Sequence, residues 1–345
     1  MLEEVTFGEI FMKVARTIGF AITVSGAAWW MLAAGANGQA IRPVAQPSTQ
    51  ATQTSTSAPQ TSAASKPTTT RASTQQASSY PTAELAKACE LAANAMLARL
   101  DKTFLAVVRP PFVVVGNRPK DDLVQMTDEW VVRPAKIMQA TYFTTPPSKV
   151  VTVLLFQDEA TYRQWAVKLY GDKDVSHFGY YKPDKRVLLV KTSTGTLLHE
   201  LSHALIVYDF PNAPLWFDEG LASLGERAKL LPEGIIALPN WRLPALQDAI
   251  RNKSLRTLKE LMTTSDFYGI NQGANYAQAK AQARYFLSYM QEKEVLESFY
   301  RQYRKSRGKN PVELVEKLLG KKIGDIDTGW RAWVMTLEYD GPPPK

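Results

Sequence analysis

The sequence predicts an α+β fold in which a mixed α/β half is followed by a mainly helical half. Up to about residue 195, β-branched runs such as VVVG and VVTVLLF alternate with segments of helical periodicity, which is typical of a small mixed sheet packed with helices. After that point strand signals nearly vanish and helical periodicity dominates. The chain has 345 residues, enough for a substantial core, but its composition changes sharply along its length.

The content of Cys and His limits the chemistry that is open to the chain. Hydrophobic residues make up 45% and charged residues 21%, which excludes wholesale disorder and a multispanning membrane protein. Cys89 is the single cysteine, so neither an intrachain disulfide nor a cysteine-rich zinc or iron–sulfur site can form. Any metal site must therefore use carboxylates and some of the three histidines.

Residues 1–40 are expected to direct export of the chain. Residues 18–36 carry no charge and follow Lys13 and Arg16, a pattern shared by signal peptides and membrane anchors. Two interpretations stay open, a signal peptide cleaved after Ala40 and an uncleaved N-terminal membrane anchor. Both place the body of the chain outside the cytoplasm, in the periplasm, in the extracellular space or at the membrane surface.

Residues 41–81 are predicted to be a disordered linker. They consist almost entirely of Ser, Thr, Gln, Ala and Pro. Such a segment has almost no large apolar side chain to bury, so burial cannot offset the loss of chain entropy on folding. We expect it to tether the globular part to the export segment.

The elements of the α/β half begin at residue 82, where the composition becomes globular. Thr82 followed by Glu84 is a helix start signal. The turn sequence KPDK at 182–185 separates two strand-like runs and predicts a hairpin. In order, we expect a helix over 83–100, a strand at 110–117, a helix near 120–141, a strand at 150–156, a helix over 158–169 and the hairpin over 178–190.

The helical half is expected to begin with two neighbouring helices. The first runs from about residue 196 to 208 and is stopped by Pro211. Pro214 suits the first turn of the second helix, and the small residues Gly220 and Ala222 would let two helices approach closely. Further helices are expected over 275–287 and over 324–337, the latter with Trp330 and Trp333 as core anchors.

The segment LLHELSHAL carries the strongest chemical signal in the chain. Its histidines, His199 and His203, are four residues apart, so on a helix they lie one turn apart on one face and can converge on a metal ion. Glu200 flanks that position and is suited to take a proton from water, as metal-assisted hydrolysis requires. The competing interpretation is an ordinary amphipathic helix, whose apolar stripe would be Leu197, Leu201, Leu205 and Tyr208.

A third metal ligand must be a His, Asp or Glu, and the segment NAPLWFDEGLASLGE offers the best candidate, Glu219. Fifteen residues lie between His203 and Glu219, enough for one helix to end and a second to return antiparallel. Asp218 and Glu226 are the rival carboxylates, and helix phase turns Asp218 about 100° away from Glu219. His177, beside the predicted hairpin, is a poor candidate.

HELSH followed by PLWFDEGLAS resembles the gluzincin metallopeptidases, most closely the bacterial peptidase MA-like domain, whose second motif reads Trp-x-x-Glu-Gly-x-Ala. The resemblance covers about residues 105–337 and implies such a domain over 82–340. It implies a zincin-like fold, in which a small mixed sheet and an active-site helix precede a mainly helical subdomain. The implied site holds Zn²⁺ between His199, His203 and Glu219, with Glu200 as general base.

One position departs from the family pattern. Thermolysin-like relatives carry, four residues after the Glu ligand, an Asp that orients a His ligand, and this chain has Ser223 there. The spacing between the two motifs is also shorter than in those relatives. The resemblance therefore does not specify which groups orient the histidines in this chain.

The resemblance also implies a mechanism of peptide hydrolysis. In such sites zinc lowers the pKa of water, and Glu200 would remove the proton so that the water can attack an amide carbonyl. Gluzincins supply a Tyr or His to the oxyanion, and Tyr276 is at the matching position, with Tyr285 as the runner-up. The strand at 187–191 is expected to be an edge strand that pairs with an extended substrate.

These observations predict an exported zinc-dependent metallopeptidase, an endopeptidase acting on a peptide or protein substrate. Two alternatives stay open, a catalytically inactive zincin-like binding module at the cell surface and a zinc amidase acting on cell-wall peptide. Nucleic acid is not expected as a partner, and the membrane is expected only through residues 1–40 if they are not cleaved. The basic cluster at 301–310 is interpreted as a solvated helical face, with anionic wall polymers or lipid headgroups as its alternative partners.

Overall fold

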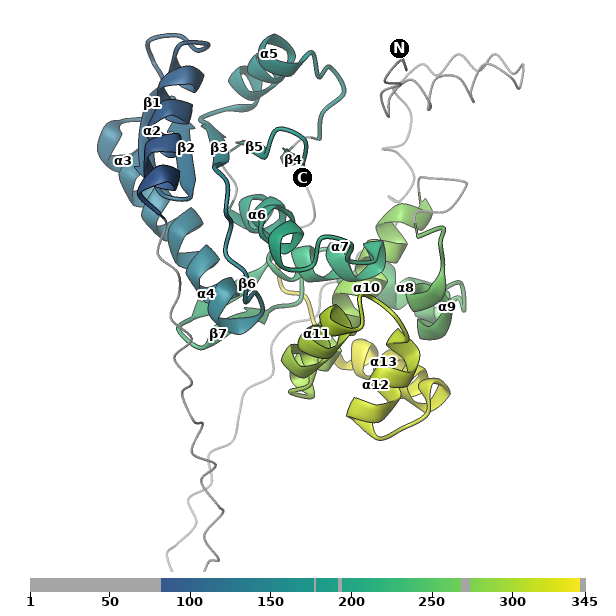
Figure 1. Ribbon diagram of the computed structural model, residues 1–345. Coiled ribbons are helices and arrows are strands. Elements are labelled where there is room, and N and C mark those ends of the chain that lie inside the picture. Colours follow the sequence, from purple (N-terminus) through teal and green to yellow (C-terminus); the bar gives the residue numbers. More distant parts are fainter. Residues whose placement is uncertain (1–81, 177, 192–193, 268–273, 342–345) are drawn as a thin grey trace, which may run out of the picture. The chain divides into compact units, whose positions relative to one another are not determined.

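A five-stranded mixed sheet forms the first half of the protein (Figure 1). The computed structural model describes residues 82–341, apart from 177, 192–193 and 268–273. The strand order is β1-β2-β3-β5-β4, so an α+β arrangement is confirmed. The strands are β1 (Leu105–Arg109), β2 (Phe112–Gly116), β3 (Val151–Phe156), β4 (Gly179–Lys182) and β5 (Val187–Lys191).

The predicted export segment at 1–40 and the predicted linker at 41–81 lie outside the described residues, as does His177. Within the described part of the chain, every helix is too short or too polar to cross a membrane. The expectations for the N-terminal 81 residues therefore stay predictions.

The pairing of the strands corrects one expectation. β2, β3 and β5 run parallel to one another, and β1 and β4 pair antiparallel at the two edges. The strand at 187–191, β5, was expected at an edge, and this is wrong, because β3 flanks it on one side and β4 on the other. The hairpin that the KPDK turn closes folds β4 onto the outer side of β5, so β4 is the edge strand.

The predicted strand at 110–117 is the second half of a hairpin. β1 precedes it and pairs from Leu105 opposite Gly116 to Arg109 opposite Phe112, with Pro110 and Pro111 in the turn. The sequence does not predict β1.

Helices cover both faces of the sheet. On β2, Val113 and Val115 point to the face covered by α2 (Ala83–Leu97) and α5 (Glu159–Tyr170), and Val114 points to the opposite face. This alternation is the period of two that a strand imposes. The start signal at residue 82 is confirmed, because the Thr82 hydroxyl accepts the N–H of Leu85. Two cores result, and the larger one continues into the helical half.

The helix expected near 120–141 is interrupted at its centre. It consists of α3 (Lys120–Met126), the π-helical segment η1 (Thr127–Val132) and α4 (Arg133–Thr141). Pro134 has no N–H to donate, so the regular hydrogen-bond ladder cannot continue through this region. The sequence predicts one continuous helix for this segment.

The second half is mainly helical, as expected, with one addition. A short hairpin of β6 (Ala228–Leu231) and β7 (Gly234–Ala237) forms where no strand was expected. The helices are α6 (Thr194–Asp209), α7 (Leu215–Leu224), α8 (Leu243–Arg251), α9 (Leu258–Thr263), α10 (Ala274–Glu292), α11 (Leu296–Lys305), α12 (Pro311–Leu319) and α13 (Ile323–Thr336).

Helix α6 packs against β4 and β5 on one side and α7 on another, and α7 packs closely along α10 (Figure 1). Gly220 permits the second of these approaches, because a methyl group there would lie 3.0 Å from Leu287 Cδ1 and 3.2 Å from the carbonyl oxygen of Ala283 on α10. At the start of α6, a methyl group on Gly195 would overlap the backbone carbonyl of Glu226. Glycine is therefore required where the chain just after α7 passes the start of α6.

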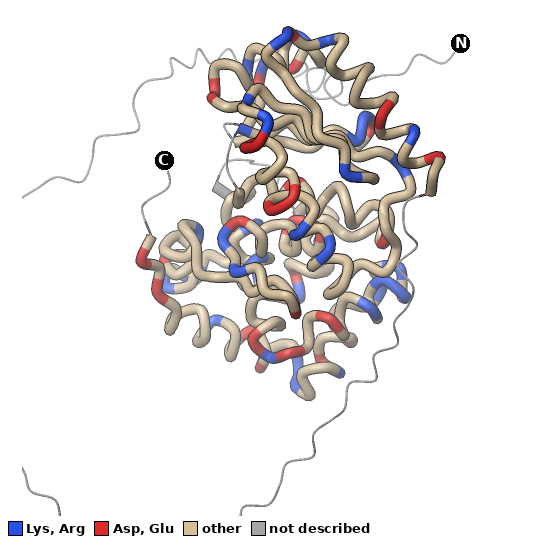
Figure 2. The backbone as a smooth tube through the Cα atoms, turned by 90° about the vertical axis from the view of Figure 1, so that its left-hand side faces the viewer, with Lys and Arg blue, Asp and Glu red and all other residues tan. Residues whose placement is uncertain are grey.

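Charged residues of both signs are interspersed over the described part of the chain (Figure 2). Within the basic cluster at 301–310, Arg301 pairs with Glu297 and Arg304 pairs with Asp209. Part of its charge is thus balanced by an exposed carboxylate, Glu297, and by a buried one, Asp209.

The buried carboxylate of Asp209 anchors the C-terminal end of α6. It accepts the backbone N–H of Thr144 at 2.9 Å and that of Thr145 at 2.7 Å. It also accepts the Tyr300 hydroxyl at 2.7 Å and pairs with Arg304, both on α11. Burial alone would raise the pKa of Asp209, but the bonds from Tyr300, Thr144 and Thr145 outweigh burial and hold that pKa below its usual value.

We expect Asp209→Asn to lower the free energy of unfolding by about 2–4 kcal/mol at neutral pH, because an amide cannot satisfy these donors or balance Arg304. Since the folded-state pKa of Asp209 is depressed, its contribution is present above the unfolded-state pKa of about 3.9 and is lost as the pH falls through the folded value. Urea unfolding of both proteins at pH 7 and pH 3 measures this difference, which should shrink at pH 3.

Asp248→Asn is the control for this prediction, because Asp248 pairs with Arg251 on an exposed helix surface. It should change the free energy of unfolding by less than about 0.5 kcal/mol. Equal losses in the two variants would contradict the anchoring role of Asp209.

Candidate metal centre

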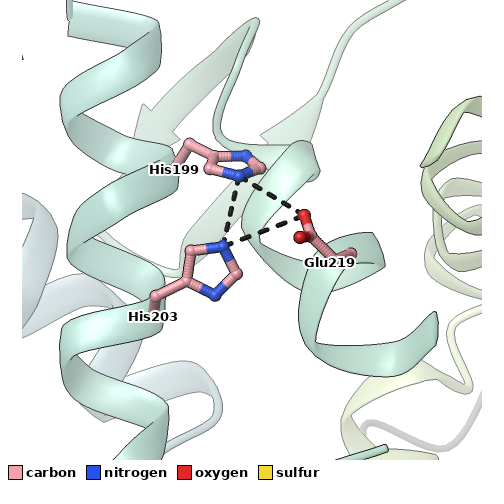
Figure 3. Close-up of side chains that lie close together, drawn as sticks. All are labelled: His199, His203 and Glu219. Atoms are coloured by element: carbon pink, nitrogen blue, oxygen red, sulfur yellow. Dashed lines mark hydrogen bonds and ion pairs between the residues drawn. The ribbon is translucent and has the colours of Figure 1, made fainter. Parts of the chain in front are cut away.

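Three side chains from two helices converge in a buried group (Figure 3). His199 and His203 project from α6, and Glu219 projects toward them from α7. The Nε2 atoms of the two histidines are 3.2 Å apart, and Glu219 Oε2 lies 3.6 Å from His199 Nε2 and 3.9 Å from His203 Nε2. One ligand atom from each residue thus falls within 4.8 Å of the others, so this group could hold a metal ion.

The donor atoms are arranged as a metal requires. The Nδ1 of His203 lies 2.9 Å from Asp218 Oδ1 and donates to it, which leaves Nε2 as the atom directed at the common point. The Nδ1 of His199 is buried without a hydrogen bond, and its nearest acidic partner is Glu226 Oε1 at 3.7 Å. Two imidazole nitrogens and one carboxylate oxygen are a donor set found in catalytic zinc sites, so these residues fit zinc.

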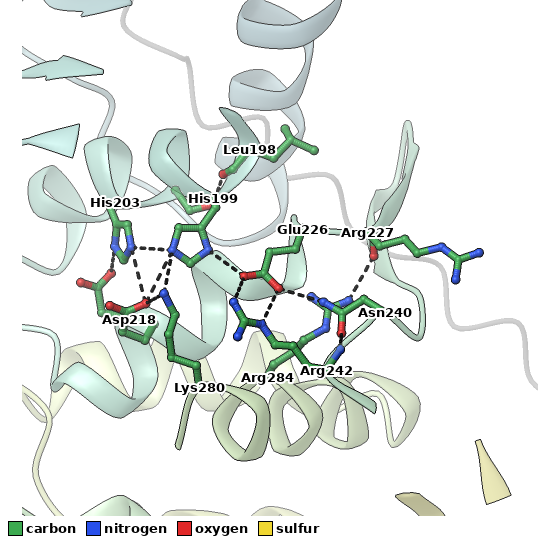
Figure 4. Close-up of polar contacts among 12 residues, drawn as sticks. Leu198, His199, His203, Asp218, Glu226, Arg227, Asn240, Arg242, Lys280 and Arg284 are labelled. Carbon is green, nitrogen blue, oxygen red and sulfur yellow. Dashed lines mark hydrogen bonds and ion pairs between the residues drawn. The ribbon is translucent and has the colours of Figure 1, made fainter. Parts of the chain in front are cut away.

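Asp218 and Glu226, the rival carboxylates of the sequence, lie behind the histidines (Figure 4). Each is next to the Nδ1 of one histidine, Asp218 beside His203 and Glu226 beside His199. The hydrogen bond to Asp218 fixes the orientation of His203 and increases its basicity, whereas Glu226 acts on His199 through its charge. The chain therefore has a carboxylate near each imidazole although Ser223 stands where thermolysin-like relatives carry an Asp.

Glu226 is itself held in place by polar side chains (Figure 4). Arg242 donates to both of its carboxylate oxygens, at 2.9 Å and 2.7 Å, and Asn240 Nδ2 donates at 2.8 Å. Burial alone would raise the pKa of Glu226, but the hydrogen bond and charge of Arg242 outweigh it and lower that pKa to about 2. Glu226 thus carries a negative charge next to His199.

The electrostatic environment of the group favours positive charge. Burial alone would lower the pKa of His203, but the carboxylates of Asp218, Glu219 and Glu200 outweigh it and raise that pKa to about 9. Burial alone would raise the pKa of Glu219. The hydrogen bond from His199 and the charges of Lys280 and His203 outweigh burial and hold that pKa well below its usual range. A cation that replaces the protons of the histidines would meet the same field.

Glu200 is half-buried on α6, one residue after His199, and is not among the three converging side chains. Its negative charge is close enough to contribute to the raised pKa of His203. This is the flanking position that the sequence predicts for a general base.

The two tyrosines proposed for the oxyanion have different surroundings. The Tyr276 hydroxyl accepts a hydrogen bond from Lys280 Nζ at 3.0 Å, and Lys280 Nζ is 2.8 Å from Glu219 Oε2. Tyr285 is fully buried, and its hydroxyl accepts the N–H of Asn240 at 2.9 Å. Tyr276 is therefore linked to the metal-binding group, and Tyr285 supports the residues around Glu226.

Sequence reasoning missed three residues of this centre, Arg242, Asn240 and Lys280. The i, i+4 spacing of Tyr276 and Lys280 on one helix was a usable signal, because such residues share a face. The positions of Arg242 and Asn240 had no comparable signal, since they precede α8 in a loop whose path depends on the packing of other elements.

A cavity of about 750 Å³ lies elsewhere, between the β6–β7 hairpin and the C-terminal part of α10. Its lining includes Tyr142, Ile235, Gln291 and Trp333 and contains none of the metal-binding residues. We therefore locate the candidate site by its side chains rather than by the size of a cavity.

No model of a known protein family matches the sequence, and no curated protein matches it either. The function of the chain is therefore inferred from the chemistry of its own residues.

We expect Asp218→Asn and Glu226→Gln each to weaken zinc binding by about 10- to 100-fold, because Asp218 accepts the Nδ1 proton of His203 and Glu226 places a negative charge 3.7 Å from the Nδ1 of His199. Competition with a chelating dye measures the dissociation constant. Glu297→Gln, which removes a carboxylate paired with Arg301 on α11, is the matched control and should leave zinc affinity unchanged. If the affinity of all three variants equals that of the wild type, neither carboxylate supports the metal ligands.

Proposed function

We propose that the protein is an exported zinc-dependent metallopeptidase of the gluzincin type, with a zincin-like fold. The observation that carries this proposal is the buried convergence of His199, His203 and Glu219 within 4.8 Å, with Glu200 next to them on α6. The resemblance of HELSH and PLWFDEGLAS to peptidase MA-like domains supports it, as does the carboxylate near each histidine.

Hydrolysis would proceed through the residues around the metal group. A zinc ion held by His199, His203 and Glu219 would lower the pKa of water and polarise a substrate carbonyl. Glu200 would take a proton from the attacking water and later deliver it to the leaving amine. The Tyr276 hydroxyl would donate a hydrogen bond to the oxyanion that develops on the substrate.

An extended peptide would bind along the edge of the sheet. β4 pairs with β5 on one side, and within the described residues no strand pairs with its other side. Since β4 packs beside α6, a peptide added to this edge would lie next to the helix that carries His199 and His203. In this proposal β4 pairs with the extended substrate, a role that the sequence analysis predicted for the strand at 187–191.

We expect purified protein to contain zinc and to cleave members of a peptide library. Glu200→Gln should lower kcat/KM by about 10²- to 10⁴-fold with zinc content unchanged, because Glu200 moves protons and is not a ligand. Zinc content is measured by atomic emission, and cleavage by mass spectrometry of the products. Glu297→Gln is the control for substitution of a surface carboxylate and should keep full activity.

Three outcomes separate the possible functions. A protein that neither contains nor binds zinc would overturn the proposal. A zinc-loaded protein that is equally inert with Glu200 and with Gln would instead be a binding module. Cleavage confined to cell-wall peptide, in a parallel digest of purified peptidoglycan, would identify an amidase.

A further inference from the structure

Lys280 is the one buried lysine among the described residues, and its ammonium lies within the metal-binding group (Figure 4). Its Nζ is 2.8 Å from Glu219 Oε2, 3.0 Å from the Tyr276 hydroxyl oxygen and 3.5 Å from His199 Nε2. A lysine ammonium is a cation at neutral pH, and here it forms an ion pair with the Glu219 carboxylate.

The position of Lys280 on α10 connects the buried ligands to the exposed Tyr276. The two residues are one helical turn apart, and the ammonium lies 5.1 Å from the centre of the Tyr276 ring. Tyr276 is 39% exposed, whereas Glu219 is 7% exposed, so Lys280 reaches from the solvent side of the group to its buried side. Lys280 thus links α10 to α7 through its ion pair with Glu219.

The chemistry of the three groups sets the direction of these bonds. An ammonium has N–H donors and no acceptor, so the Tyr276 oxygen accepts from Lys280 and does not use its own proton in that bond. A charge-assisted hydrogen bond is stronger than a neutral one and restricts where the hydroxyl can lie. A hydroxyl fixed in this way can donate its proton to negative charge that develops next to it.

We propose that Lys280 is a positioning residue that fixes the Tyr276 hydroxyl beside the metal ligand Glu219, and that its charge weakens metal binding by Glu219. The role of the hydroxyl rests on the proposed peptidase function, whereas the effect on metal binding does not. A cation 2.8 Å from a ligand oxygen shares that oxygen with the metal and repels it.

The metal effect is tested by zinc affinity alone. Lys280→Met removes the charge and keeps the length of the side chain, and we expect it to bind zinc at least about tenfold more tightly. Lys280→Arg keeps the charge and should stay near the wild-type affinity. Lys280→Gln, which is also uncharged, replaces the Met variant if that variant does not fold. Unchanged or weaker zinc binding in the uncharged variants would overturn the proposal.

The chain offers a control lysine directly after the end of α10. Lys293 follows Tyr289 at the same four-residue spacing, and its ammonium lies 5.3 Å from the centre of that ring. Lys293→Met therefore removes an equivalent lysine–tyrosine pair that does not touch a metal ligand, and it should change neither zinc affinity nor activity.

The positioning role is tested by a double-mutant cycle with Tyr276→Phe. If Lys280 acts through Tyr276, Lys280→Met should lower kcat about 10- to 100-fold with little change in KM, and the double variant should be no slower than Tyr276→Phe. Independent effects that multiply in the double variant would show that Lys280 does not act through the hydroxyl.

A spectroscopic measurement separates failure of this inference from failure of the proposed function. In protein labelled with fluorotyrosine, the ¹⁹F resonance missing from Tyr276→Phe identifies residue 276. That resonance should shift in Lys280→Met and not in Lys293→Met, whether or not the protein cleaves peptides. An unmoved resonance would overturn the positioning role, whereas a shifted resonance in a protein without zinc-dependent cleavage would leave only the proposed function refuted.

Discussion

The packing of α6 against α7 is the contact on which the candidate metal centre depends. It brings three ionisable side chains together in the interior, where an unpaired charge is costly and each group must be balanced by a neighbour. The close passage of the chain at Gly195 and Gly225 sets this geometry, since a side chain at 195 would overlap Glu226 and one at 225 would lie 2.8 Å from Leu198 Cβ. The same passage brings Glu226 next to His199.

Charged side chains of alternating sign surround the centre. The histidines face carboxylates on α7 and just after it, and those carboxylates face cations from elements later in the chain. Arg242 holds Glu226 from the start of α8, and Lys280 holds Glu219 from α10. A bound metal would therefore join a group whose charged side chains are already paired with neighbours of opposite charge.

The rest of the fold supports this arrangement from two sides. The sheet provides a rigid base for α6, whose far end is tied through Asp209 to α11 and to the loop before β3. On the other side α10 packs along α7 and carries Tyr276 at the solvent side of the group. The edge strand β4 also packs against α6, so a substrate strand added there would lie beside the helix that carries His199 and His203.

The residues that share one element could be predicted from its period, and the approach of Glu219 to the two histidines was expected from the need for a third ligand, but most other contacts between elements could not be predicted. The four-residue spacing of His199 and His203 reveals their common face because a helix has a fixed period, and the runs that became β2, β3 and β5 were recognisable from their β-branched residues. The strands β1, β6 and β7 were not predicted. The edge position of β4, the place of Glu226 beside His199 and the reach of Lys280 to Glu219 depend on how helices and strands pack. Packing joins residues as far apart as His199 and Lys280, and no local periodicity records such a contact.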